Sequence, residues 1–426
     1  MRETRHKESY LKVKRVEVNE KHIPLRVILF FVFLIIAIAG IAVGVYSLSL
    51  KKEGWYQIES DNADISGDFS FNYYISGNSN NERRNTYNIV KNAYSSMCLR
   101  YKKVFDTQNE YDDVVNVAYI NKHLNEDIVV DKELYYAFSK LNEHKDNRIL
   151  YYRPIFDAYY NLFNYVNNGA SIDQFNPDKN QQLKDYIDEL FTYCNDENSI
   201  SIKVLADNKI RLEVSDSYVS YCETNGISTF IDFAYLRNVI VIDLIEDEFV
   251  NNGYINGYIV SSDGYMSIFT SENINMRIRN LTDLVITDVG SISYTGRVNI
   301  VEMFPFLANQ EGKWYYIFDK NSYVTAYFTK EGKSSPLHLD MLFYSDNINL
   351  GCIDILLDAY DVFVDESLDL SKVNNLKDND ISTIYSKDNK IYYNDDNSKI
   401  DNIIEGYTKE KISWRNYSKQ IQFSYW

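Results

Sequence analysis

Residues 352–360, CIDILLDAY, place two aspartates inside an otherwise apolar run. The run predicts a helix, on which Asp354 and Asp358 stand at positions i and i+4, on one face and about one turn apart. Two carboxylates at this spacing repel each other by a few tenths of a kcal/mol on an exposed helix, and by more when they are buried. Either a cation compensates for this pair or both side chains face solvent.

An uncharged stretch near the N-terminus is the strongest local signal in the 426-residue chain. Residues 27–50, VILFFVFLIIAIAGIAVGVYSLSL, contain no charged side chain. As a helix they would extend about 36 Å, enough to cross a hydrocarbon core of about 30 Å. A cleaved signal peptide is the alternative, because residues 37–39, AIA, resemble a cleavage site. The run is much longer than a signal-peptide core, so we expect an uncleaved signal anchor, a single transmembrane helix.

Charge predicts the orientation of this anchor. Residues 1–26 carry eight Lys and Arg against four Asp and Glu, a net charge of +4, and the chain's net charge of −17 leaves −21 for the remainder. By the positive-inside rule, the basic tail of residues 1–26 stays in the cytoplasm and the bulk of the chain is extracytoplasmic, at the cell membrane. So acidic an ectodomain excludes nucleic acid as a partner, because phosphate binding depends on basic side chains.

Cysteines and histidines are few and scattered. The chain has four cysteines, Cys98, Cys194, Cys222 and Cys352. They form no CxxC pattern, so a zinc site is not expected. Outside the cell Cys194 could pair with Cys222, or all four could be small buried thiols. A surface or capping role is expected for the isolated histidines of this region, His123, His144 and His338.

From residue 54 onward, helical and strand patterns are mixed, which predicts an α+β fold. Helices are expected over residues 85–105, 130–144 (with Asp131 as N-cap), 155–166, 180–194 and 352–364. Strands are expected over residues 67–77, 199–218 (two strands about a turn at Asp207-Asn208), 255–270, 313–319 and 322–329. The pattern predicts a domain over residues 54–365, followed by a peripheral, polar, Tyr- and Asn-rich C-terminal appendage over residues 366–426.

Eight short segments follow one another in a specific order. They are KVFDTQNEYDDVVNVAYIN (103–121), VVDKELYYAFSKL (129–141), IFDAYYNLF (155–163), FIDFAYLRNVIVID (230–243), NGYIVSSDGYMSI (256–268), SYTGR (293–297), KWYYIFDKNSY (313–323) and IDILLDAY (353–360). In this order they resemble the motifs of the FAD:protein FMN transferase family, the ApbE type. The resemblance covers roughly residues 54–365.

The resemblance implies an ApbE-like, two-layer, mixed-sheet fold, with FAD and Mg²⁺ as cofactors. It implies transfer of FMN from FAD to Ser or Thr of an exported flavoprotein acceptor. The family's Mg²⁺-binding Asp and Thr are matched by Asp354 and Asp358, whose carboxylates suit a hard cation. Six further residues match cofactor-binding positions: Asp106, Asp232, Arg237, Asp263, Thr295 and Asp319. We expect Asp232, Thr295, Asp319 and Asp354 to converge around one cleft.

Several motif residues of the family are replaced in this chain. The glycines that make room for the flavin are Ala234 and Tyr235 here. The family's Lys is replaced by Asn238, beside which Arg237 could steer a phosphate. The family's second His, the general base, is matched by Tyr316, so the catalytic residues of this chain are unknown. We therefore expect a degenerate transferase, a pseudoenzyme with weak or absent FAD binding and activity.

Two alternatives remain open on the sequence. A non-catalytic cell-surface binding module could retain the fold without the chemistry. An adhesin-like ectodomain unrelated to flavin is the other.

Overall fold

The computed structural model describes residues 23–48, 52–61, 67–144, 147–167, 169–306, 314–319, 322–334, 336–365 and 367–412. Contacts divide the chain into two units, residues 1–52 with 77–84, and residues 53–76 with 85–426. In the first unit, α1 (Ile23–Leu48) is one helix, and its side chains from residue 28 to residue 44 are all exposed. No helix in the described ranges is both long and apolar enough to cross a membrane. Residues 1–22 of the predicted basic tail and residues 49–50 at the end of the predicted span lie outside these ranges.

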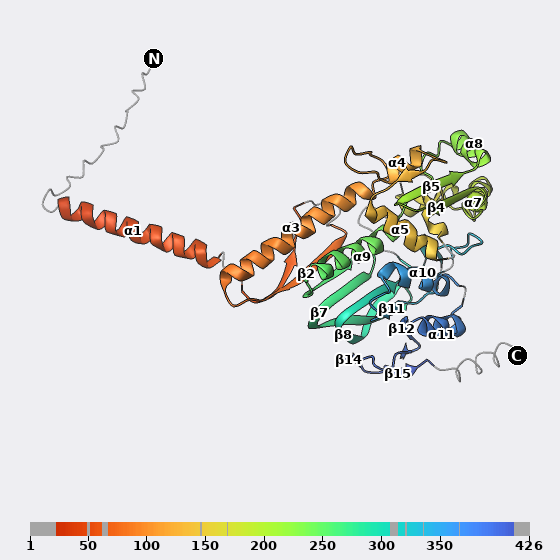
Figure 1. Cartoon of the computed structure of the whole chain (residues 1–426). Coiled ribbons are helices and arrows are strands. Elements are labelled where there is room, and N and C mark those ends of the chain that lie inside the picture. The colour runs from red at the N-terminus through yellow and green to blue at the C-terminus, as the bar shows by residue number, and fades with distance from the viewer. Residues whose placement is uncertain are drawn as a thin grey trace, which may run out of the picture. The chain divides into compact units, whose positions relative to one another are not determined.

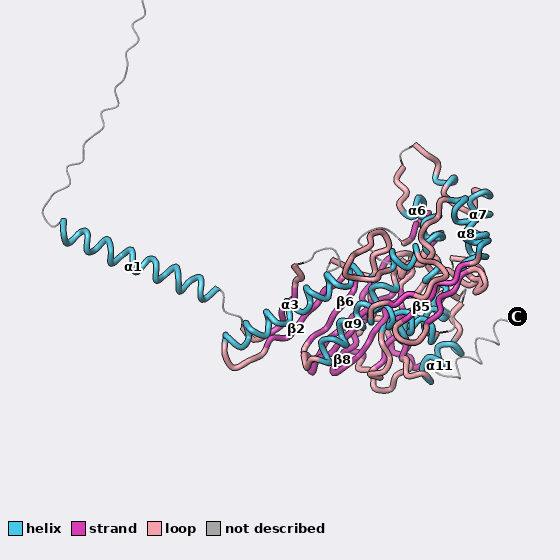
Figure 2. The backbone as a smooth tube through the Cα atoms, turned by 45° about the horizontal axis from the view of Figure 1, so that its top comes forward, coloured by secondary structure: helices cyan, strands magenta, loops and turns pink. Residues whose placement is uncertain are grey.

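The second unit is built on a ten-stranded mixed sheet (Figures 1 and 2). Its strands, in spatial order, are β1 (Gly54–Ile58), β2 (Phe69–Ile75), β6 (Gly257–Ser261), β7 (Tyr265–Thr282), β8 (Val285–Met303), β11 (Met341–Ser345), β12 (Ser382–Lys387), β13 (Lys390–Tyr393) and β15 (Thr408–Lys411), with β14 (Ile400–Asp401) pairing to β8. Neighbouring strands are antiparallel except β13 and β15. The predicted α+β class and the strands expected over residues 67–77 and 255–270 are confirmed.

Two tight turns order the centre of the sheet. Gly264, between β6 and β7, adopts a φ of +93°, a conformation that glycine takes without a steric penalty. The long β7–β8 hairpin turns at Asp283 (φ 49°) and Leu284 (φ 65°). Two consecutive positive φ angles give the twist that suits a two-residue hairpin loop.

One face of the sheet is covered by helices. Figure 1 shows α9 (Leu236–Asn251) and α10 (Cys352–Phe363) against the central strands, and both helices contact β7. The remaining helices are α3 (Asn80–Val104), α4 (Val117–Lys122), α5 (Lys132–Glu143), α6 (Arg153–Phe163), α7 (Gln181–Cys194), α8 (Asp216–Asn225) and α11 (Leu370–Asp378), with 3₁₀ turns at Arg148–Tyr151 and Ile172–Gln174. The helices and this face of the sheet share the larger hydrophobic core.

The opposite face is covered by the C-terminal part of the chain. Ile384, Ile391 and Ile400 are buried with Ile300 and Leu342 in a second hydrophobic core. The appendage expected over residues 366–426 is therefore corrected: its described residues supply α11 and four strands of the main sheet. The polar composition concealed this role, because each of these strands is short and buries only a few apolar side chains.

Two smaller sheets complete the unit. β3 (Ile128–Val129), β5 (Lys209–Val214) and β4 (Ile200–Val204) form one, and β10 (Ser322–Thr325) and β9 (Tyr315–Asp319) form the other. The predicted turn at Asp207-Asn208 is confirmed, with φ angles of 60° and 55°. Asp131 occupies the expected N-cap of α5, but its side chain makes no cap hydrogen bond and instead pairs with Arg100 at 3.1 Å.

All four cysteines are buried and unpaired in the described part of the chain. The Cys194 thiol donates a hydrogen bond to the backbone oxygen of Tyr151, 3.1 Å away. The pairing of Cys194 with Cys222 is therefore absent, and the alternative of buried thiols holds. Burial raises the pKa of Cys194 to about 12, which keeps the thiol protonated and unreactive.

Removing residues 366–426 should abolish folding of the second unit, because it deletes four strands and exposes the second core. Each buried isoleucine lost costs about 1.5–3 kcal/mol, against a typical total stability of about 5–15 kcal/mol. We expect no cooperative thermal transition by circular dichroism. Removing only residues 413–426, which takes away no described residue, is the control and should leave the transition in place. A truncated chain that still melts cooperatively at the wild-type temperature would contradict this assignment.

Candidate functional site

Helix α10 begins at a tight junction with α9. A Cβ at Gly351, the N-cap, would lie 2.5 Å from Oδ2 of Asp243, so the junction admits only glycine. The Asp243 carboxyl accepts hydrogen bonds from the backbone N–H groups of Cys352 (2.6 Å) and Ile353 (3.0 Å). Asp354 accepts a hydrogen bond from the Gly351 N–H at 2.9 Å. Two carboxyl groups therefore satisfy the free N–H groups of this helix start.

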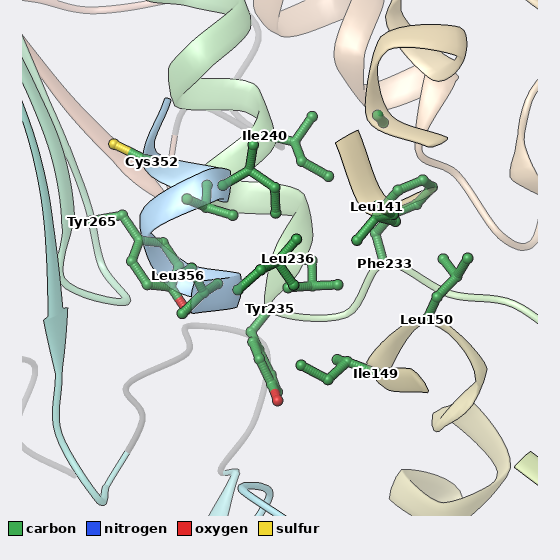
Figure 3. Close-up of a cluster of buried hydrophobic side chains, with 14 of the residues drawn as sticks. Leu141, Ile149, Leu150, Phe233, Tyr235, Leu236, Ile240, Tyr265, Cys352 and Leu356 are labelled. Atoms are coloured by element: carbon green, nitrogen blue, oxygen red, sulfur yellow. The ribbon is translucent and has the colours of Figure 1, made fainter. Parts of the chain in front are cut away.

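Apolar side chains next to this junction pack α9 against α10. Figure 3 shows Leu236 and Ile240 of α9 next to Cys352 and Leu356 of α10, and all four are fully buried. The helix start is thus held from both sides, by hydrogen bonds and by packing. The direction in which Asp354 points is fixed by the fold.

Lys140 of α5 and His144 at the C-cap of that helix compensate for the aspartates of α10. Lys140 Nζ lies 3.1 Å from Oδ2 and 3.2 Å from Oδ1 of Asp354. His144 bridges the two acids, because its Nε2 lies 3.2 Å from Asp354 Oδ1 and its Nδ1 lies 3.1 Å from Asp358 Oδ1. We call these four residues, Lys140, His144, Asp354 and Asp358, the α5–α10 charge cluster. The repulsion expected from residues 352–360 is relieved by side chains of the protein itself.

The surface or capping role expected for His144 is corrected by this geometry. It stands at the C-cap of α5, but its side chain is only 17% exposed and both ring nitrogens contact carboxylates. The sequence contained a signal that could have identified it. Lys140 and His144 are spaced i and i+4, the same spacing as Asp354 and Asp358, and two such pairs of opposite charge can compensate each other when their side chains meet.

The cluster shifts the protonation of its members. Burial opposes a charge on His144, but its hydrogen bonds to Asp354 and Asp358 raise its pKa to about 9. Burial likewise acts against ionisation of Asp354, yet the contacts with His144, the Gly351 N–H and Lys140 hold its pKa below the usual range. The pKa of Lys140 is raised by Asp354 despite partial burial. Near neutral pH the cluster therefore holds two cations against two carboxylates.

Asp232, a predicted cofactor-binding residue, anchors the start of α9. Its Oδ2 accepts a hydrogen bond from Arg153 at 2.7 Å, and its Oδ1 accepts one from the backbone N–H of Ala234 at 2.9 Å. Arg153 also pairs with Asp157 at 2.9 Å. Ala234 has a φ of 47°, which a glycine would adopt more readily. Asp232 therefore has protein partners on both carboxylate oxygens.

Tyr235 fills the space beside this turn. Its side chain is 1% exposed, and its ring centroid lies 5.7 Å from that of Tyr327 and 6.2 Å from that of Phe156. Its hydroxyl donates a hydrogen bond to the Tyr360 hydroxyl at 3.4 Å. Trp314, from the segment that precedes β9, packs against the same ring at 6.3 Å. Aromatic side chains from four separate segments therefore surround the Tyr235 ring and leave it buried.

Arg237 and Asp263, which were also predicted to bind the cofactor, contact other side chains of the protein. Arg237 forms an ion pair with the buried Asp68, and Asn238 donates a hydrogen bond to Asp263. Burial raises the pKa of Asp263 to about 7, with the Asn238 hydrogen bond acting in the opposite direction. The guanidinium of Arg237, expected to steer a phosphate, instead neutralises an internal carboxylate.

Asp106 organises its own loop. Its carboxylate accepts hydrogen bonds from the backbone N–H groups of Gln108 (2.7 Å) and Asn109 (3.0 Å) and from the Tyr111 hydroxyl (2.8 Å). This is the pattern of an aspartate that stabilises a turn. These contacts lower the pKa of Asp106 despite its partial burial.

The remaining predicted residues lie on β8 and β9. Thr295 is exposed on β8 and lines a cavity of about 240 Å³ together with Tyr344 and Asp395. Asp319 is the exposed last residue of β9. Tyr316, also on β9, packs its ring 5.1 Å from that of Phe318.

The structure brings Asp354 and Asp358 together through His144, and it gives Asp106, Asp232, Arg237 and Asp263 separate partners. The cavity at Thr295 does not include Asp232, Asp319 or Asp354 in its lining. Within the described residues, no group of three or more His, Cys, Asp or Glu side chains is arranged to hold a metal ion.

Comparisons with known proteins give structural similarity alone. No protein-family model matches the chain, and no curated protein matches its sequence. The fold is similar to that of "Flavin Transferase ApbE from Vibrio cholerae", with a TM-score of 0.46 and 10% identity over 82% of this chain and 97% of that one. It is also similar to "Crystal structure of Pseudomonas stutzeri flavinyl transferase ApbE, apo form", with a TM-score of 0.44 and 11% identity over 79% and 91%.

The α5–α10 charge cluster should make stability depend on pH. The folded-state pKa of His144, about 9, lies above its ordinary value of 6.5, so its contribution is complete below pH 6.5 and is lost as the pH rises through 9. The melting temperature should therefore fall over this window. In a His144→Gln variant, which keeps hydrogen-bonding capacity but cannot titrate, that part of the decrease should disappear. Identical profiles for both proteins would show that His144 is not held as an imidazolium.

Proposed function

We propose that this chain is a degenerate relative of the FAD:protein FMN transferases that neither binds FAD appreciably nor transfers FMN. On this proposal it acts as a non-catalytic, cell-surface binding module. The observation that carries the proposal is the α5–α10 charge cluster, in which Lys140 and His144 occupy both carboxylates that match the family's metal ligands. The motif order of the sequence supports common ancestry, and the contacts of the replaced residues support the loss of chemistry.

Mg²⁺ does not fit the residues present. A divalent cation at Asp354 and Asp358 would need free carboxylate oxygens, but both oxygens of Asp354 contact Lys140 and one contacts His144. Binding would have to displace an ammonium and an imidazolium that already neutralise the pair. The charges that favour a metal in the family are therefore satisfied here without one.

FAD does not fit either. The glycine that would let a cofactor approach the backbone is Tyr235, whose ring is fully buried against Phe156 and Tyr327. Moving this ring would open a cavity in the core, a change that typically costs several kcal/mol for an aromatic side chain. Arg237 is paired with Asp68 and is not available to a phosphate. We derive no catalytic step for this chain.

A retained transferase is the other candidate function. It would require a general base where the family has its second histidine, and that position is Tyr316. A phenol is a poor base near neutral pH, and loss of a general base typically costs about 10²–10⁴ in rate. The packing of Tyr316 against Phe318 supports a structural role.

Membrane attachment is a separate part of the proposal. The uncharged run of residues 27–50 and the net charge of +4 over residues 1–26 support a single-pass anchor with a cytoplasmic N-terminus. The remaining, acidic chain would then face the outside, where a binding module meets its ligands.

The chemistry can be tested with purified full-length chain. Incubated with FAD and Mg²⁺, the wild type should release no FMN, and flavin fluorescence should report no binding at micromolar FAD. By electron paramagnetic resonance the wild type should not bind Mn²⁺. A Lys140→Gln, His144→Gln double variant, which frees the two carboxylates, should gain weak Mn²⁺ binding.

Two further variants sharpen this test. Adding Asp354→Ala to the double variant should abolish the gained Mn²⁺ signal, whereas adding Asp157→Ala, an acidic side chain outside the cluster, should not. Mg²⁺-dependent FMN release by the wild type that Asp354→Ala abolishes would refute the proposal and restore the enzyme.

Orientation in the membrane has its own prediction. Protease added to intact cells should degrade nearly the whole chain and leave a protected fragment of about the first 50 residues, as the positive-inside rule predicts. Immunoblotting with a tag at the N-terminus would follow that fragment. Complete protection of residues 53–426 would contradict the topology, and a secreted form that begins near residue 40 would indicate a cleaved signal peptide.

A further inference from the structure

A second hollow lies at the opposite end of α10 from the charge cluster. The cavity measures about 710 Å³, within the range of about 300–1,000 Å³ typical of small-molecule sites. Leu337, one of its lining residues, donates its backbone N–H to the backbone oxygen of Phe363, the last residue of α10, at 2.7 Å. Asp354 stands in the first turn of that helix. The cavity is therefore a separate feature from the α5–α10 charge cluster.

The floor of the cavity is formed by apolar side chains that are largely buried in the protein. Leu281, Leu337 and Leu339 line it and are each less than 10% exposed, and Leu368 adds a partly buried side chain. Asp340, which follows Leu339 in the chain, is buried and pairs with the Arg279 guanidinium at 2.7 Å. Such a floor keeps its shape without a ligand, which reduces the entropic cost of binding.

Two hairpin tips form part of the rim. Asp283 lies at the tip of β7–β8 and Asp388 at the tip of β12–β13, and both have positive φ angles, 49° and 50°. Lys387 stands beside Asp388. The rim thus carries two carboxylates and one ammonium, a balance that disfavours phosphates and other anions.

An imidazole and a phenol form the remaining wall. The Tyr323 hydroxyl and His338 Nδ1 are 3.3 Å apart, and their rings lie 5.8 Å apart. Burial lowers the pKa of His338, with the charge of Asp283 acting in the opposite direction, so the imidazole is neutral near pH 7. A neutral ring offers one donor and one acceptor, and its flat face can pack against an apolar surface.

The other polar groups of the cavity are uncharged. They are the amide of Asn280 and the hydroxyls of Thr282, Ser367 and Ser386. The Asn280 amide donates a hydrogen bond to the Thr282 hydroxyl at 2.8 Å, and the Ser386 hydroxyl donates one to the backbone oxygen of Lys390 at 3.2 Å. Amide and hydroxyl oxygens also accept hydrogen bonds, which matches a ligand that carries many hydroxyl donors. The leucine side chains and the aromatic rings of the cavity can pack against the C–H groups on the face of a sugar ring.

We propose that this cavity binds a neutral oligosaccharide, with Tyr323 and His338 as the packing wall and Asp283 as a hydrogen-bond acceptor on the rim. The inference deepens the proposed binding-module function by naming the class of ligand. It does not depend on whether the α5–α10 charge cluster excludes a metal. An enzyme that transferred FMN could also carry this cavity, so the two proposals fail independently.

The test uses the full chain in a detergent without a sugar head group. Saturation-transfer NMR and calorimetry would screen neutral trisaccharides of glucose, mannose, galactose and N-acetylglucosamine, each to millimolar concentration. We expect at least one to bind, and both Tyr323→Ala and His338→Ala to weaken that binding at least tenfold. Tyr160→Ala, which removes an exposed tyrosine outside the cavity lining, is the matched control and should bind as the wild type does.

Asp283→Asn keeps the test valid if the alanine variants unfold. Asparagine tolerates the positive φ of this position, so the hairpin should persist while the carboxylate is lost. We expect at least threefold weaker binding from a folded Asp283→Asn protein with an unchanged melting temperature. Failure of all four trisaccharides to bind the wild type would overturn the proposal. Binding that none of the three cavity variants weakens would overturn it as well.

Discussion

The position of α10 depends on how the charges at its first turn are balanced. Asp354 is 4% exposed, yet it is ionised and stands one turn before a second aspartate. An uncompensated carboxylate at such a site would cost far more than packing could recover. Lys140 and His144 supply the compensation, and because they come from α5 they also tie α5 to α10. The contacts that neutralise the aspartates are therefore the same contacts that hold α5 next to α10.

The same helix contacts α9, α11 and three strands of the main sheet, β7, β8 and β11. Its buried face packs against α9 and the sheet, and its last turn adjoins the cavity that we assign to a saccharide. Asp243, buried in the middle of α9, satisfies the N–H groups of Cys352 and Ile353 and so fixes where α10 begins. A rigid helix held at both ends can carry a binding surface at one end while its other end serves stability alone.

Aromatic side chains fill the core beside the turn that precedes α9. Tyr235 brings a large ring and a hydroxyl into a space lined by Phe156, Tyr327 and Tyr360. The result is a close-packed aromatic cluster around the start of α9. The volume around Tyr235 is therefore taken up by packing that stabilises the core.

The sequence by itself determined the elements and the acidic pair. Period-two and helical patterns located five helices of the domain (α3, α5, α6, α7 and α10) and seven strands (β2, β4, β5, β6, β7, β9 and β10), since these follow from local side-chain spacing. They missed α8 and the two strands β8 and β11 at the centre of the sheet. The sequence did not determine the partners of Asp354 and Asp358, because Lys140 and His144 lie more than 200 residues away and meet them only in the folded chain. It also misjudged the C-terminal strands, whose burial depends on the face that β8 and β11 offer. Pairing across the chain is a property of packing, and only the tertiary structure decided it.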